Sequence, residues 1–277
     1  MTEIAAIVLC AGEGRRLRPI TERLPKALCT VANVSLVRWA LESPVAQGLR
    51  RAVNAHHHAE QVVAHVGALD AAITVSVEQP RALGTAGAIA QLAPWLDGAH
   101  ALVQNADAWI PDPPEDFVTG WDGARPRLLV RRTGGPSDFG ELKFLGLSLL
   151  PHPEVARLRA EPTGLYEVVW RDAWLRGELE LVEHDGVAFD VGTPERLLAA
   201  NLTAGGGRSF VHPTARVRAH LRSCVALPGA VAPDPEELSY CVLGPGSLRV
   251  PCDVRVVAEE QALGRGLSGA GPGHNLI

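Results

Sequence analysis

The order of strand-like and helix-like segments over the first hundred residues is the feature that most constrains the fold. Residues 4–10 form a short apolar run that ends at Gly12 and Gly14, as a buried strand does when it feeds a glycine loop. Further strands are predicted at 51–54, 73–77 and 101–104, and helices at 36–47, 58–66 and 84–96. This alternation favours an α/β fold with a mostly parallel sheet and helices on both faces. Ligands bind such sheets at the carboxyl ends of the strands.

In the second half of the chain, the sequence pattern changes at a run of three glycines, residues 205–207. Before it, strands are predicted at 127–130, 144–149 and 187–191, and helices at 165–176 and 194–202, the last capped by Thr193. After it, short valine-bearing segments recur roughly every six to eight residues, which is typical of a parallel β-helix. We therefore expect a catalytic domain at 1–207, a short left-handed β-helix-like extension at 208–257 and a disordered tail at 258–277.

Bulk properties exclude several classes of protein. A net charge of -5 argues against a nucleic-acid-binding surface, which normally carries excess positive charge. The five cysteines form no C-x-x-C pair, so neither zinc spacing nor a disulfide framework is indicated. No signal peptide or membrane-length apolar run is found, and we expect a soluble, cytoplasmic protein with no membrane partner.

The glycine loop carries the strongest chemical signal. Residues 9–26 read L-C-A-G-E-G-R-R-L-R-P-I-T-E-R-L-P-K. Gly12 and Gly14 allow the backbone to approach a phosphate with its N–H groups directed at the oxygens. Arg15, Arg16 and Lys26 add the positive charge that a triphosphate requires.

Two other phosphate motifs are absent from this loop. The string does not contain G-x-x-x-x-G-K-[ST], so a P-loop is not supported. It does not contain G-x-G-x-x-G either, because Leu17 occupies the third glycine position, which argues against a dinucleotide-binding dehydrogenase.

The string closely resembles the signature of the sugar-1-phosphate nucleotidylyltransferases, L-x-x-G-x-G-[ST]-R-[LM]-x-P-[LI]-T followed by P-K. The family includes mannose-1-phosphate guanylyltransferases and has a Rossmann-like catalytic domain. The residues that match are Gly12, Gly14, Arg16, Leu17, Pro19, Thr21, Pro25 and Lys26. Arg15 departs from the pattern, because a small hydroxyl residue is usual there.

The resemblance implies that this loop wraps the triphosphate, with Arg16 and Lys26 as catalytic cations. A second string, V-E-Q-P-R-A-L-G-T-A-G-A at 77–88, is similar to the family segment that contacts the base, through Gln79 or Glu78 and through Gly84. The nucleotide-binding residues implied are Leu9, Ala11, Gly12, Glu13, Gly14, Arg15, Arg16, Gln79, Gly84 and Thr85.

Two carboxylates are implied as ligands of a magnesium ion. Residues 102–109, L-V-Q-N-A-D-A-W, resemble the family's N-G-D segment, and the resemblance assigns Asp107 as catalytic residue and metal ligand. Ala106 stands where glycine is usual. F-D-V-G-T-P-E-R at 189–196 resembles the D-x-G-T-P segment and assigns Asp190 as the second ligand. Mg²⁺ binds in this way through one or two carboxylates plus phosphates.

The sugar-binding residues rest on weaker resemblances. Segments 144–150 and 165–169 look like the family strand and helix that place Gly146, Glu167 and Val168 at the sugar, and Gly192 would lie near it. The usual E-K-P segment, whose lysine touches the sugar phosphate, is absent. Lys143 is the candidate substitute.

The function expected is nucleotidyl transfer from a nucleoside triphosphate to a sugar-1-phosphate. GTP is favoured because L-G-T-A-G is frequent in guanylyltransferases, and the acceptor expected is mannose-1-phosphate or a related sugar. Thymidylyl or uridylyl transfer, and a non-catalytic relative that senses a nucleotide-sugar, remain open. The extension can serve as a homo-oligomerisation module or pack on the main domain, and the sequence leaves both open.

Overall fold

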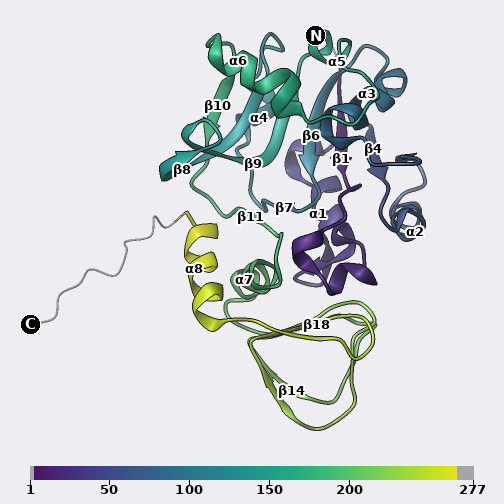
Figure 1. Cartoon of the computed structure of the whole chain (residues 1–277), viewed down its shortest axis with the longest axis vertical. Coiled ribbons are helices and arrows are strands. Elements are labelled where there is room, and N and C mark those ends of the chain that lie inside the picture. The colour runs from purple at the N-terminus through teal and green to yellow at the C-terminus, as the bar shows by residue number, and fades with distance from the viewer. Residues whose placement is uncertain (1–2, 267–277) are drawn as a thin grey trace, which may run out of the picture.

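A computed structural model describes residues 3–266 of the 277-residue chain. Its centre is a seven-stranded sheet in the order β10-β8-β9-β6-β1-β4-β5 (Figure 1). The strands are β1 (Ile4–Leu9), β4 (Arg51–Ala55), β5 (Thr74–Val77), β6 (His100–Asn105), β8 (Arg127–Ser137), β9 (Gly140–Leu150) and β10 (Glu180–Glu183). β1 pairs in parallel with both β4 and β6, and β4 with β5, so the predicted mostly parallel α/β sheet is confirmed.

Helices cover both faces of the sheet, as expected for strands that are apolar on both faces. The helices are α1 (Leu36–Leu41), α2 (Ala59–Leu69), α3 (Gly84–Leu96), α4 (Asp116–Thr119), α5 (His152–Val155), α6 (Arg171–Leu175), α7 (Pro194–Ala204) and α8 (Val254–Gly264). Successive β1 side chains point to opposite faces: Ile7 packs with Ile89 of α3, and Val8 packs with Leu36 of α1. Both faces are therefore apolar, and the strands read as continuous hydrophobic runs.

The half of the sheet beyond β6 differs from the sequence-based expectation. β9 runs antiparallel to both β6 and β8, and the β8–β9 hairpin is much longer than the predicted apolar segments. Its outer part is polar, so hydrophobic pattern did not show it. β10 was not predicted, and the expected helix at 165–176 is a π-helical turn, Tyr166–Trp170, followed by α6.

The C-terminal extension is a short stack of parallel strands with a triangular outline in Figure 1. On one side β12 (Phe210–Val211), β15 (Val225–Ala226) and β18 (Cys241–Leu243) pair in parallel. The other sides are formed by β13 (Arg216–Val217) with β16 (Val231–Ala232) and by β14 (His220–Arg222) with β17 (Glu237–Ser239). β19 (Arg249–Pro251) closes the stack as an antiparallel neighbour of β18. This is the β-helix-like extension expected from the recurring valines.

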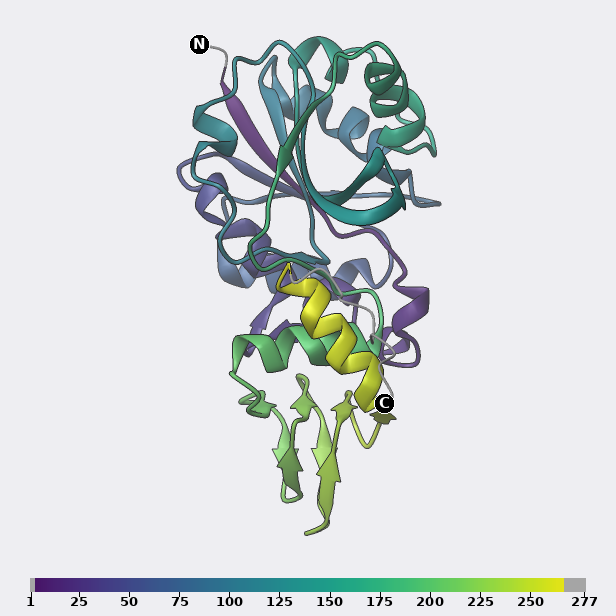
Figure 2. The same ribbon diagram turned by 90° about the vertical axis from the view of Figure 1, so that its left-hand side faces the viewer.

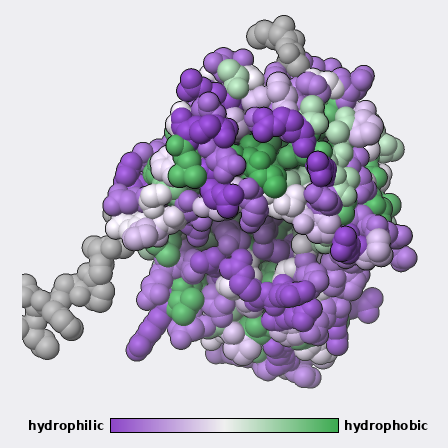
Figure 3. Space-filling view, turned by 45° about the horizontal axis from the view of Figure 1, so that its top comes forward, coloured by the Kyte–Doolittle hydropathy of each residue, from purple (hydrophilic) through white to green (hydrophobic). Residues whose placement is uncertain are grey.

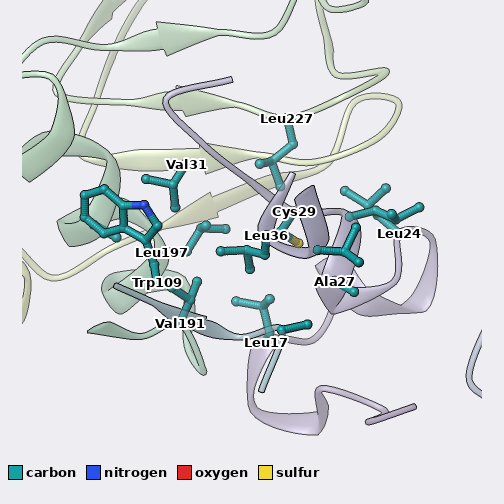
Figure 4. Close-up of a cluster of buried hydrophobic side chains, with 14 of the residues drawn as sticks. Leu17, Leu24, Ala27, Cys29, Val31, Leu36, Trp109, Val191, Leu197 and Leu227 are labelled. Atoms are coloured by element: carbon teal, nitrogen blue, oxygen red, sulfur yellow. The ribbon is translucent and has the colours of Figure 1, made fainter. Parts of the chain in front are cut away.

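α7 and α8 lie side by side between the sheet and the extension (Figure 2). The hydrophobic cluster around them joins Leu17 and Leu36 of the main domain to Leu197 of α7 and Leu227 of the extension (Figure 4). Because one continuous core spans these parts, the extension is packed on the main domain rather than tethered to it.

The expectation of disorder from residue 258 is corrected by α8. This helix begins at its N-cap Asp253, whose side chain accepts a hydrogen bond from the Arg255 backbone N–H, and buries Val257 against the cluster. The rest of the predicted tail, residues 267–277, lies outside the described residues. Within residues 3–266, no helix combines the length and hydrophobicity that crossing a membrane would require.

Candidate active site

The glycine loop between β1 and the first short helical turn contains a left-handed backbone position that favours glycine. Gly14 has φ of 61°, and a Cβ there would lie 2.9 Å from Thr21 Cγ2 and 3.2 Å from Lys26 Cβ. The Thr21 hydroxyl donates a 2.9 Å hydrogen bond to the Gly14 carbonyl oxygen, which fixes the loop. At Gly12, by contrast, a Cβ would meet nothing within 4 Å, so the loop is open toward the cavity there.

Asp107 and Asp190 are brought together by backbone pairing. Asp107 lies in the turn between β6 and β7 (Ala108–Trp109), and Asp190 lies in β11 (Phe189–Asp190). β11 runs antiparallel to β7 with Asp190 opposite Ala108, and the Val191 N–H donates a 2.9 Å bond to the Asp107 carbonyl oxygen. Two carboxylates that are 83 positions apart in the chain thus border one cavity.

Three basic side chains neutralise this pair of carboxylates. The Lys26 ammonium bonds Asp107 Oδ2 and lies 3.8 Å from Asp190 Oδ1. Asp190 Oδ2 also faces Arg16 Nη2 at 3.4 Å and Arg196 Nη1 at 3.0 Å. Burial lowers the pKa of Arg196, but its bonds to Glu260 and Asp190 outweigh burial and raise the pKa. The site therefore holds fixed positive charge next to two carboxylates.

Two adjoining cavities meet at this cluster. One, of about 260 Å³, is bordered by Gly12, Lys26 and the start of α3. The other, of about 470 Å³, is bordered by Arg16, Gly146 and Asp190. Asn105 and Asp107 line both cavities, so two ligands could meet there.

On the face in Figure 3, hydrophilic residues surround an apolar patch in the upper part, and the surface is hollowed below that patch.

The first turn of α3 is held against the segment that precedes the π-helical turn. Gly84 has φ of 69°, and a Cβ there would overlap the Thr163 carbonyl oxygen. The Thr85 hydroxyl accepts a 2.8 Å bond from the Leu165 backbone N–H. Gly84 and Thr85 nevertheless border the smaller cavity, so this turn forms one of its walls and supports the neighbouring segment as well.

The structure gathers most of the predicted site residues but not all of them. Those that line a cavity are Leu9, Ala11, Gly12, Arg16, Lys26, Gly84, Thr85, Asp107, Gly146 and Asp190. Gly192 packs against the Arg16 guanidinium, because a Cβ added to Gly192 would lie 2.7 Å from Arg16 Nη2. The predicted residues that line neither cavity are Glu13, Gly14, Arg15, Gln79, Glu167, Val168 and Gly192.

Two of the acidic residues from the motifs have clear structural partners instead. Glu78 is 1% exposed, accepts from Asn54 Nδ2 and from the Leu83 N–H, both at 2.7 Å, and so fixes the loop before α3. Glu13 is paired with Arg15, whose hydrogen bond and charge lower the Glu13 pKa. The alternative of base contact by Glu78 is therefore not supported.

The sequence analysis gave no role to several residues that line the larger cavity. Asn105 was inside a quoted motif, two positions before Asp107, but was given no role. Arg196 lies inside the T-P-E-R string and was likewise passed over. Arg131 and Glu260 carried no sequence signal, because they reach the cavity only through the long hairpin and the unexpected α8.

The carboxylate pair fits a divalent cation of the Mg²⁺ type. Asp107 and Asp190 present oxygen atoms to the same ammonium group, so both can also face one metal ion. Within residues 3–266 no group of three or more His, Cys, Asp or Glu could hold a metal. Two carboxylates suffice for Mg²⁺, which completes its shell with water and phosphate oxygens.

Comparison with known proteins identifies the family. The sequence model of the family described as nucleotidyl transferase matches residues 5–144, about half of the chain. The chain belongs to this family. The matched part contains the glycine loop, the α3 turn and Asp107, which are the walls of the smaller cavity.

Relatives place this family member among the sugar-1-phosphate nucleotidylyltransferases. An N-acetylmuramate α-1-phosphate uridylyltransferase of Caulobacter vibrioides is 39% identical over 38% of this chain, a match that spans 46% of that protein. The enzyme of the same name from Neisseria meningitidis is 28% identical over 72% of this chain and 98% of its own length. Relatives named as thymidylyltransferases and guanylyltransferases also match, at 35% and 25% identity.

A solved structure supports the fold. It is described as a glucose-1-phosphate thymidylyltransferase from Bacillus anthracis in complex with sucrose, and it matches 73% of this chain and 95% of its own with a TM-score of 0.61. The identity is 19%, so this likeness concerns the arrangement of the backbone alone.

Proposed function

We propose that this chain transfers a nucleotidyl group from a nucleoside triphosphate to a sugar-1-phosphate and releases pyrophosphate. The observation that carries the proposal is the junction of two cavities at Asp107, with Asp190 and Lys26 beside it. The smaller cavity would take the nucleotide against the glycine loop, and the larger would take the sugar phosphate.

The chain's own residues position the substrates and neutralise their charge. An oxygen of the sugar phosphate attacks the α-phosphorus, and pyrophosphate leaves in line, so no protein nucleophile is required. Arg16 and the loop N–H groups hold the leaving phosphates, and Lys26 stabilises the charge at the reacting phosphate. When bound by Asp107 and Asp190, Mg²⁺ supplies Lewis-acid stabilisation of phosphate oxygens.

The proposal also concerns which nucleoside triphosphate is the donor and which sugar phosphate is the acceptor. The sequence favours GTP and mannose-1-phosphate, whereas the two uridylyltransferase relatives favour UTP, with thymidylyl transfer as a third candidate. The alternative of a nucleotide-sugar sensor is weakened by the site, because binding alone does not require both carboxylates beside Lys26 and Arg16. The cytoplasmic location and oligomerisation through the extension stay predictions.

Pyrophosphate release tests the proposal. Purified protein with Mg²⁺ is offered GTP, UTP, dTTP or ATP with a panel of sugar-1-phosphates, and the nucleotide-sugar is identified by mass spectrometry. We expect release with a restricted set of pairs and none without the sugar phosphate. Binding of a nucleotide-sugar with no release from any pair would favour the sensor.

A further inference from the structure

The chain contains two lysines, and both line the candidate active site. Lys26 bonds Asp107 at the junction of the cavities. Lys143 lies on β9 at the wall of the larger cavity, directly opposite Arg131 of β8 in the antiparallel register. Facing residues of an antiparallel pair project from the same side of the sheet, so Lys143 and Arg131 form a pair of neighbouring positive charges.

In the part of the chain that the structure describes, neither charge forms an ion pair with a carboxylate, although the charge of nearby Asp185 acts to raise the Arg131 pKa against the effect of burial. The adjacent Arg132 is paired with both Glu141 and Glu183. The Arg131 guanidinium donates only to carbonyl oxygens, among them those of Leu263 at 2.7 Å and Gly186. Within residues 3–266, Lys143 has no ion pair and no side-chain hydrogen bond, although its side chain borders the cavity. Like charges directly opposite each other destabilise a sheet, and a bound anion would relieve this repulsion.

The position of Lys143 separates it from the reacting phosphate. Asn105 and Asp107 line both cavities, and under the proposed function the reacting phosphates would meet there. Gly146 lies against this point, because a Cβ on it would be 3.4 Å from Asn105 Cβ. Lys143 is three residues farther along β9, which corresponds to about 10 Å of extended strand. An anion held by Lys143 would therefore lie at the far end of the sugar, away from the phosphate on C1.

We propose that Lys143, supported by the charge of Arg131, binds a carboxylate carried by the sugar, so that the acceptor is an acidic sugar-1-phosphate. The proposal rests on the proposed function and specifies its substrate class. In this proposal Lys143 binds the acidic substituent of the sugar. It does not bind the phosphate on C1, as it would if it replaced the lysine of the missing E-K-P segment.

Matched acceptors test the proposal. Glucuronate 1-phosphate is compared with glucose 1-phosphate, and N-acetylmuramate 1-phosphate with N-acetylglucosamine 1-phosphate, in pairs that differ by the acidic substituent. We expect kcat/KM to be higher for the acidic member, and Lys143→Gln to reduce this preference ~10- to 100-fold, as for a lost hydrogen bond to a charged group. Arg216→Gln, at an exposed position on β13 outside both cavities, is the control and should keep the preference.

Two results of this assay would overturn the proposal. One is a wild-type protein that turns over the neutral acceptors as well as the acidic ones. The other is a Lys143→Gln variant that loses the same factor on both members of a pair, because Lys143 would then serve the phosphate that they share.

Lysine acetylation read by mass spectrometry separates this proposal from the proposed function. Glucuronate 1-phosphate should protect Lys143 from acetic anhydride at concentrations where glucose 1-phosphate does not. That result would hold even if no pair released pyrophosphate, in which case the proposed function alone fails. Equal protection by the two sugars, or none, would overturn the carboxylate site.

Discussion

Gly146 determines how closely β9 approaches the junction of the cavities. It has φ of 93°, and a Cβ on it would lie 2.5 Å from Ala108 Cβ, next to Asp107. The position therefore needs glycine both for its backbone conformation and for space.

We predict that Gly146→Ala lowers the free energy of unfolding by about 1–3 kcal/mol and also lowers turnover, because β7 must move. Urea denaturation and pyrophosphate release measure the two effects. Gly134→Ala is the matched control, since Gly134 also has positive φ, 72°, but an added Cβ would meet nothing within 4 Å. An equal loss of stability in both variants would assign the effect to backbone strain instead of the contact with Ala108.

At the scale of elements, α7 supports the site through one buried amide. Asn201 is fully buried, donates to the carbonyl oxygens of Thr30 and Leu197 at 2.8 and 2.9 Å, and accepts from the Ala32 N–H at 3.1 Å. It thereby ties the hairpin of β2 (Thr30–Val31) and β3 (Val34–Ser35) to α7, at whose start Arg196 lies.

We predict that Asn201→Ala lowers the free energy of unfolding by about 2–4 kcal/mol, because it leaves buried backbone groups without partners. Urea denaturation of the variant and the wild type provides the measurement. A loss of less than about 1 kcal/mol would mean that water or a local shift replaces the amide.

The elements that the sequence predicted well share a simple property. α3 was predicted with its observed bounds, and β1, β4 and β6 within a residue or two, because each contains a run of apolar residues that is buried in the fold. α8 was missed because Val257 and Gly264 are its only buried residues, so the helix depends on tertiary packing that no local pattern encodes.

The candidate site was predictable to the extent that it follows strand ends. Asp107 and Asp190 were found from motifs, and the β7–β11 pairing explains why they meet. Arg131 and Glu260 were not, because they approach the larger cavity from a polar hairpin and from the far end of the chain. The structural role of Glu78 was not predictable, because its buried partners, Asn54 and Leu83, come from another strand and a loop whose positions are set by the fold.

At the scale of the whole molecule, four buried or partly buried histidines link stability to pH. Burial lowers the pKa of His65, His100, His184 and His212 below the ordinary value of 6.5. Below pH 6.5 the unfolded chain therefore binds more protons than the folded chain, and the free energy of unfolding falls as the pH decreases.

We predict a lower urea midpoint at pH 5.5 than at pH 7.5. The stabilising contribution is fully present above pH 6.5 and is lost as the pH falls toward the depressed pKa values of the folded state. His100→Gln should reduce the difference between the two midpoints, and His220→Gln, at an exposed position on β14, should leave it unchanged. A midpoint that rises on acidification would contradict this assignment.

The central claim is that nucleotidyl transfer occurs where the two cavities meet at Asp107. The most direct test is the rate of pyrophosphate release by the Asp107→Asn variant with the preferred donor and acceptor. Asp112→Asn, at an exposed position in the segment after β7, is measured in the same assay as the control. The account predicts a fall of about 100-fold or more for Asp107→Asn, with the fold intact, and no change for Asp112→Asn. Release by Asp107→Asn at the wild-type rate would place the reaction elsewhere.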